Sequence, residues 1–208
     1  MGPVETAAAP GVVRSSPPRP RVPAPRPFTC AEYYRLAEAG ILGPDERVEL
    51  LDGVVIAMPA MGGRHASCIG RLSEAFVAGV GQRGLVRIQL PLRLDDASEP
   101  EPDLAVVLRQ GPTAYLSRHP GPAESLLVIE AGDSSATFDR EDKAPRYARA
   151  GISELWLIDL EADLVRVLLR PVLGEWSEAR VLRRGDTVSP TAFADLRLEV
   201  TDLLGPPG

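Results

Sequence analysis

Two short apolar runs in the middle of the chain each carry one carboxylate at an end. Asp103 precedes the run Leu104–Leu108, and Glu130 closes the run that begins at Leu126. Aliphatic runs this short are typical of strands that are buried on both faces. A carboxylate at the end of a buried strand costs free energy unless a cation pairs with it. Asp103 and Glu130 are therefore candidates for a metal site or for ion pairs.

A lysine and a third acid extend this set. Lys143 follows Glu130 after a polar turn, and Glu49 lies among apolar residues just before the turn Asp52-Gly53. Carboxylates of this kind can hold Mg²⁺, and an ammonium group can stabilise developing negative charge. Each residue also has an ordinary interpretation, Lys143 as an exposed helix lysine and Glu49 as an exposed strand residue.

Composition favours a soluble globular protein. The chain has 208 residues, 44% of them apolar and 25% charged, which suits one ordinary domain. No apolar run approaches the ~20 residues that cross a bilayer, and the first residues lack the apolar core of a secretory signal. Cys30 and Cys68 form neither a disulfide framework nor a zinc site, and His65 and His119 are too few for a histidine metal cluster. A reducing cytoplasm is the expected compartment, with no membrane partner.

Charge divides the chain unevenly. Residues 1–27 are rich in Pro, Arg and Ala and carry a net charge of +3, which leaves −9 for the remainder out of a total of −6. The composition of residues 1–27 predicts a disordered tail. The acidic remainder is unsuited to general nucleic-acid binding, which needs clustered Lys and Arg. Contact with nucleic acid would have to come from a local patch, from the tail or through a divalent cation.

Periodicity and turn signals predict an α/β domain over residues 28–204, with helices packed on a mixed, curved sheet. Thr29 and Glu32 match a capping box at the start of a helix, and Asp52-Gly53 predicts a two-residue hairpin turn. Pro145 predicts that the helix around it either starts there or bends. The expected helices are 31–39, 65–80 and 139–150. The expected strands are 47–51, 54–58, 85–94, 102–108, 126–130, 154–160, 164–169, 176–182 and 196–200.

Four stretches together resemble a known family. They are Val48–Gly53, Glu101–Leu104, Val128–Ala131 and Lys143–Trp156. Their order resembles the PD-(D/E)XK nuclease superfamily and, more closely, the Uma-type restriction endonuclease family, a bacterial domain family of unknown function. The resemblance covers residues 28–204. It implies a restriction-endonuclease-like fold and an endonuclease that hydrolyses DNA with Mg²⁺, for which Mn²⁺ could substitute.

The resemblance also implies roles for single residues. Asp103 and Glu130 would be the acids that bind the metal, Glu49 would help to shape the metal site, and Lys143 would be the catalytic lysine. The superfamily pattern places its lysine two positions after the second acid, where this chain has Gly132, so the resemblance implies that the following helix supplies it. The carbonyl of Ala131 is a further candidate metal ligand. His65, Gln89 and Ser134 are candidates for contact with the substrate. Cutting both DNA strands needs two sites, so a homodimer is expected to be possible.

Three interpretations stay open on the sequence. The favoured one is a metal-dependent deoxyribonuclease. The second is a catalytically degenerate nuclease fold that binds nucleic acid or a protein partner without cleavage, which the acidic surface and Gly132 would allow. The third is an unrelated α+β domain, in which the acids form salt bridges with Arg64, Arg93 or Arg146.

Overall fold

The computed structural model describes residue 2 and residues 25–206. The predicted disordered tail, residues 1–27, lies almost entirely outside this range. The helices are α1 Cys30–Glu38, α2 Gly63–Val80, α3 Ala136–Phe138, α4 Ala144–Ala150 and α5 Val200–Leu204, with short 3₁₀ turns at 81–83, 122–124 and 191–193 and a π-helical turn at Asp139–Lys143. The strands are β1 Val48–Leu51, β2 Val54–Ala57, β3 Leu85–Ile88, β4 Leu104–Val107, β5 Ser125–Gly132, β6 Glu154–Asp159, β7 Leu164–Val172, β8 Glu175–Leu182, β9 Thr187–Val188 and β10 Leu198–Glu199.

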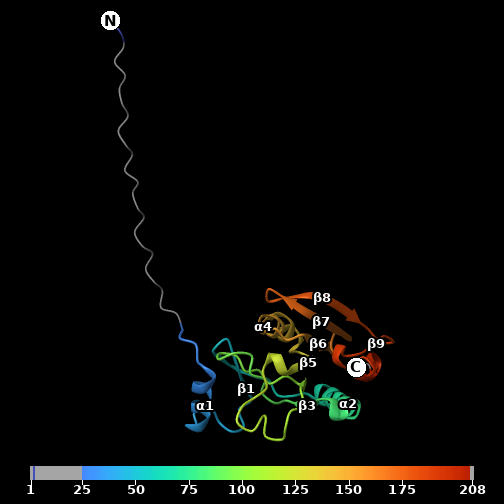
Figure 1. Cartoon of the computed structure of the whole chain (residues 1–208), viewed down its shortest axis with the longest axis horizontal. Coiled ribbons are helices and arrows are strands. Elements are labelled where there is room, and N and C mark those ends of the chain that lie inside the picture. The colour runs from blue at the N-terminus through green and yellow to red at the C-terminus, as the bar shows by residue number, and fades with distance from the viewer. Residues whose placement is uncertain (1, 3–24, 207–208) are drawn as a thin grey trace.

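Six strands form one mixed sheet in the order β3-β4-β5-β6-β7-β8 (Figure 1). Only β5 and β6 are parallel within it, and the chain between them forms the α3–α4 crossover. The other neighbours in the sheet pair antiparallel. The predicted mixed sheet flanked by helices is therefore confirmed.

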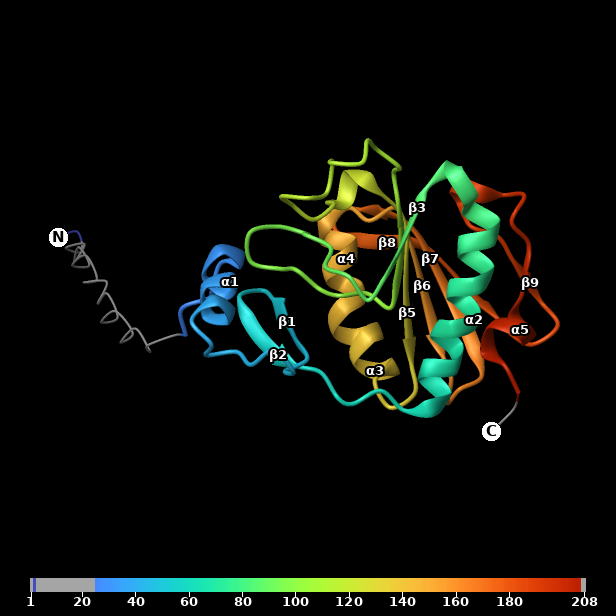
Figure 2. The same cartoon turned by 90° about the horizontal axis from the view of Figure 1, so that it is seen from below.

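Helices cover both faces of the sheet (Figure 2). On one face, α2 and α5 contribute to a core in which Leu72 and Phe76 meet Ile129 and Trp156. On the other face, Tyr147 of α4 packs with Val128 and neighbouring apolar residues. β4 and most of β5 are buried on both faces, which agrees with the near-continuous apolar runs in their sequences. Asp103, just before β4, and Glu130, within β5, therefore lie next to the core.

A separate hairpin, β1–β2, lies beside the main sheet. Its turn is Asp52-Gly53, as the sequence predicts, and both residues have positive φ, 48° and 76°. This is the conformation that a two-residue turn of type I′ requires. The Glu99 amide donates a hydrogen bond to the Leu50 carbonyl at 2.7 Å, which attaches β1 to the loop before β4.

Two of the predicted strands differ most from the structure, which makes them much shorter. The strand predicted for residues 85–94 ends at Ile88, because Gln89 has φ 49° and Pro91 lacks an amide donor. The chain then forms a loop in which the amide of Leu94 bonds to the carbonyl of Ser98. The strand predicted for 196–200 is reduced to β10, which pairs with β9 outside the main sheet, since Val200 already begins α5.

The helix predicted for 139–150 begins earlier and changes its winding. It starts as α3 at Ala136, widens into the π-helical turn Asp139–Lys143 and continues as α4. A proline ring excludes the carbonyl four residues earlier, so the wider turn accommodates Pro145 without ending the helix. This adjustment directs both Asp139 and Lys143 inward, since both are buried.

Candidate active site

The hairpin, the start of α2 and the start of the α3–α4 crossover gather at one end of the sheet (Figure 2). A cavity of about 190 Å³ lies between them. Glu49 from β1, Asp103 before β4 and Glu130 from β5 line it with His65, Asp139 and Lys143. Residues far apart in the sequence thus meet at one place, and most of them are carboxylates.

Lys143 joins two of these carboxylates. Its Nζ lies 3.0 Å from Glu49 Oε1 and 3.2 Å from Glu130 Oε1, and all three side chains are almost fully buried. The hydroxyl of Tyr147, one helical turn after Lys143, donates a third bond to Glu130 Oε1 at 2.6 Å. The four-residue spacing of Lys143 and Tyr147 predicts a shared face, and both side chains reach Glu130.

The charges of this group perturb one another. Burial raises the pKa of Glu130 well above its usual value and also raises that of Glu49, while the charge of Lys143 opposes both shifts. Burial alone would lower the pKa of Lys143, but the charges of Glu130 and Glu49 outweigh it and raise that pKa. Lys143 therefore stays protonated at neutral pH, so it can stabilise negative charge but cannot act as a base.

Asp103 is held by groups from three segments. Its Oδ2 accepts a hydrogen bond from the amide of Ala131 at 2.8 Å, and its Oδ1 accepts one from Gln89 Nε2 at 3.2 Å. His65 Nε2 lies 3.0 Å from Oδ2. The Asp103 carboxylate raises the pKa of His65, against the effect of burial. These contacts fix the direction of a carboxylate that is only 7% exposed.

Gly132 explains why the lysine lies elsewhere. A β-carbon at this position would lie 2.5 Å from the Ala136 amide nitrogen and 2.9 Å from Asp139 Oδ2. The chain turns into α3 so closely here that no side chain fits at the end of β5. Lys143 is the sole lysine of the whole sequence, whose other 22 basic residues, histidines aside, are arginines. That count was an available sequence signal for a special role, and it reinforces the choice of Lys143.

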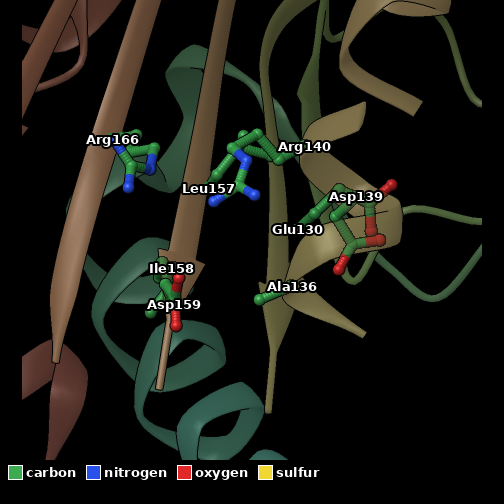
Figure 3. A pocket seen from close by; sticks show the side chains of 8 residues that line it. All are labelled: Glu130, Ala136, Asp139, Arg140, Leu157, Ile158, Asp159 and Arg166. Atoms are coloured by element: carbon green, nitrogen blue, oxygen red, sulfur yellow. The ribbon is translucent and has the colours of Figure 1, made fainter. Parts of the chain in front are cut away.

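Asp139 is a site residue that the sequence reasoning missed. It is 4% exposed and lies beside Glu130, as Figure 3 shows, and its Oδ2 accepts a hydrogen bond from Ser135 Oγ at 3.2 Å. Burial raises its pKa to about 6. On their far side, Glu130 and Asp139 line a second cavity of only about 10 Å³ next to Leu157 and Arg166 (Figure 3). The spacing Asp139, Lys143, Tyr147, four residues apart each time, could have indicated it.

The remaining sequence candidates occupy more varied positions. Ser134 lines the main cavity and is exposed, while Gln89 contacts Asp103. The structure shows the amide of Ala131 bonded to Asp103, and a metal-binding role for its carbonyl stays a prediction.

The interpretation in which the acids serve arginine salt bridges is wrong. Within residues 25–206, Glu49 and Glu130 form ion pairs with Lys143, and Asp103 with His65. Arg93 pairs instead with Asp96 and Glu99, and Arg146 with Asp52 and Asp142.

The donor atoms suit a hard divalent cation. Six carboxylates and one imidazole line the cavity, and carboxylate oxygen is the ligand that Mg²⁺ and Mn²⁺ prefer. Glu49 Oε2 and His65 Nε2 are buried without a hydrogen-bond partner in the described chain. No three acidic, histidine or cysteine side chains of residues 25–206 already form a closed metal cage. A cation would have to draw these carboxylates together and separate some of them from Lys143.

Comparisons with known proteins agree with this geometry. The model of the Uma2 family, described as "Putative restriction endonuclease", matches residues 30–201. A solved structure described as "a putative nuclease belonging to DUF820" from Anabaena variabilis shares the fold, with a TM-score of 0.68 at 20% sequence identity. The match covers 86% of this chain and 98% of that one. No curated protein matches the chain significantly.

Proposed function

Because the chain belongs to the Uma2 restriction endonuclease family, we propose that it is a metal-dependent endonuclease that hydrolyses phosphodiester bonds in DNA. The observation that carries this proposal is the convergence of Glu49, Glu130 and Lys143, with Asp103 on the same cavity. A buried ammonium among carboxylates provides the two features that phosphoryl transfer needs, a place for a cation and a fixed positive charge.

Mg²⁺, or Mn²⁺ in its place, would supply charge neutralisation on the phosphate and a more acidic water. Asp103, Glu49 and Glu130 would hold it, with the Ala131 carbonyl as a further ligand. The Ala131 amide and Gln89 keep the Asp103 carboxylate in position. His65 and Ser134, on the same cavity, would contact the DNA or its phosphate, and Gln89 would do so from beside Asp103.

The group that accepts a proton from the attacking water must be one other than Lys143. Lys143 keeps its proton and would stabilise the charge that develops on the phosphate oxygens. Asp139, with its pKa raised to about 6, is the carboxyl best suited to accept a proton from water at neutral pH. Asp139 would then act as the base, while Lys143 remains a fixed charge.

Nicking of supercoiled plasmid tests this function. We expect cleavage by the wild type with Mn²⁺ or Mg²⁺ and none with EDTA. Asp103→Asn keeps the shape of the side chain but removes its charge, and it should lower the rate by at least about 100-fold. Glu161→Gln, an exposed acid in the turn between β6 and β7, is the matched control and should cut at the wild-type rate.

Binding without cleavage is the alternative function. Lys143 donates hydrogen bonds to two carboxylates, which is compatible with a site that no longer opens for a metal. Plasmid that is shifted in a gel but never cut, under every metal condition, would favour this alternative.

Double-strand cutting would further imply a homodimer. We also propose a reducing cytoplasm as its compartment, with which the free, buried cysteines Cys30 and Cys68 are compatible.

A further inference from the structure

His65 has a position that the roles given above do not explain. It is the third residue of α2, and its side chain is 17% exposed at the wall of the main cavity. Its Nε2 is 3.0 Å from Asp103 Oδ2 but forms no hydrogen bond there. At this distance an N–H aimed at the carboxylate would bond to it. The Nε2 atom is therefore buried beside a carboxylate oxygen of the same cavity and has no hydrogen-bond partner in the described chain.

The distance between these two atoms fits a shared metal ion. Two adjacent ligands that are each about 2.1 Å from an octahedral cation lie about 3.0 Å apart. A second donor on the same cavity, Glu49 Oε2, is likewise buried and without a hydrogen-bond partner in the described chain. The Glu49 side chain is only 4% exposed, so water does not readily satisfy this oxygen.

We propose that His65 is a nitrogen ligand of the divalent cation, beside Asp103. This inference rests on the proposed function, because it assigns a further ligand to the same metal site. Imidazole binds transition metals in preference to Mg²⁺, which favours oxygen and water. His65 therefore makes Mn²⁺, or another first-row transition metal, the preferred ion of this site.

The Asp103 contacts support this assignment. The Ala131 amide bonds to Oδ2 and Gln89 bonds to Oδ1, so each carboxylate oxygen keeps a further lone pair for a cation. Metal ligands are commonly oriented by such neighbouring hydrogen bonds. The ring must be neutral to bind a metal, so metal binding would release any proton that Asp103 holds on His65.

The experiment uses the full chain with Mn²⁺ and pulsed electron paramagnetic resonance. The sequence has only two histidines, His65 and His119, and His119 lines a different cavity where it stacks on Tyr34. Protein labelled with ¹⁵N-histidine should show a histidine nitrogen coupled to Mn²⁺. The coupling should persist in His119→Gln and disappear in His65→Gln. Calorimetry should show Mn²⁺ binding weakened by at least about 10-fold in His65→Gln, and Mg²⁺ binding weakened by less.

The outcomes separate this inference from the proposed function. Mn²⁺ binding that is lost in Asp103→Asn but shows no histidine coupling in the wild type would overturn the role of His65 and leave the metal site intact. A coupling that disappears in His119→Gln would overturn it too. No Mn²⁺ binding at millimolar concentration would overturn both the proposed function and this inference. His119 lies on a different cavity, so a coupling that persists in His119→Gln assigns the nitrogen to His65 even if His65→Gln folds poorly.

Discussion

At the scale of single residues, the site depends on one ammonium group buried between two carboxylates. Lys143 is the sole lysine in a chain that otherwise uses arginine, and its compact ammonium is buried within reach of both Glu49 and Glu130. Removing one partner of a buried ion pair leaves an uncompensated charge, at a cost of about 3–5 kcal/mol. We therefore expect Lys143→Met to lower the free energy of unfolding by about 3 kcal/mol at pH 8, measured by urea denaturation.

The same variant has a built-in control. In Lys143→Met, Glu49 and Glu130 can become neutral by taking up protons, so the loss of stability should shrink as the pH falls toward 5. Adding Glu130→Gln to Lys143→Met should recover part of the lost stability, because it removes one of the two buried carboxylates that the loss of Lys143 leaves without a partner. Equal losses at pH 5 and pH 8 would contradict a buried ion pair at this place.

Asp139 makes stability depend on pH in a specific direction. Its pKa rises from 3.8 in an ordinary environment to about 6 in the fold, chiefly through burial. The folded chain then binds more protons than the unfolded chain between these values, so the stability linked to Asp139 falls as the pH rises from about 4 to 6. Asp139→Asn should be more stable than the wild type at pH 8, by on the order of 2 kcal/mol, and equally stable near pH 4.

Urea denaturation at pH 4 and pH 8 checks this prediction. The matched control is Asp133→Asn, an exposed acid on the same cavity, which should follow the wild type at both pH values. The stabilised Asp139→Asn should also cut DNA more slowly if Asp139 accepts the proton from water. A variant that is no more stable at pH 8 than at pH 4, relative to the wild type, would show that burial does not perturb this carboxyl.

At the scale of elements, the junction of β5 with α3 leaves no room for a side chain at Gly132. A β-carbon at Gly132 would come within 2.7 Å of two backbone atoms of Ala136, which cannot move aside as a flexible side chain could. Gly132→Ala should destabilise the fold by about 1–3 kcal/mol, seen as a lower melting temperature. Gly111→Ala, in a loop with open space around it, should have no such effect. A Gly132→Ala protein that melts with the wild type would contradict this close approach.

The elements also show what the sequence could predict. The hairpin at Asp52-Gly53 and the buried strands that end near Asp103 and Glu130 follow from local patterns, because turn chemistry and apolar runs are encoded over a few residues. The early end of β3 depends on the positive φ of Gln89, a conformation that a non-glycine residue rarely signals. The π-helical turn arises from Pro145 together with the packing of Lys143, which is a tertiary effect. The four-residue spacing of Asp139 and Lys143 was visible in the sequence, but the burial of Asp139 depends on tertiary packing.

At the scale of the whole molecule, separate segments bring like charges together. One cavity is lined by carboxylates from different elements, namely Glu49, Asp103, Glu130 and Asp139. Of the lysines and arginines that line this cavity, Lys143 is the one that is buried. Folding must therefore overcome the repulsion between these carboxylates, and a divalent cation would relieve that repulsion. Among the described residues no helix is long and apolar enough to span a bilayer.

Metal should therefore stabilise the entire fold. A ligand that binds only the folded chain, at about ten times its dissociation constant, adds about 1.4 kcal/mol. For a domain of this size we expect the melting temperature to rise by roughly 3–5 °C with Mn²⁺, and by less with Mg²⁺ if His65 is a ligand. Calorimetric scans with EDTA, Mg²⁺ and Mn²⁺ measure this directly. Asp103→Asn should lose the rise while Glu161→Gln keeps it, and a melting temperature that ignores millimolar Mn²⁺ would mean that these carboxylates do not share a cation.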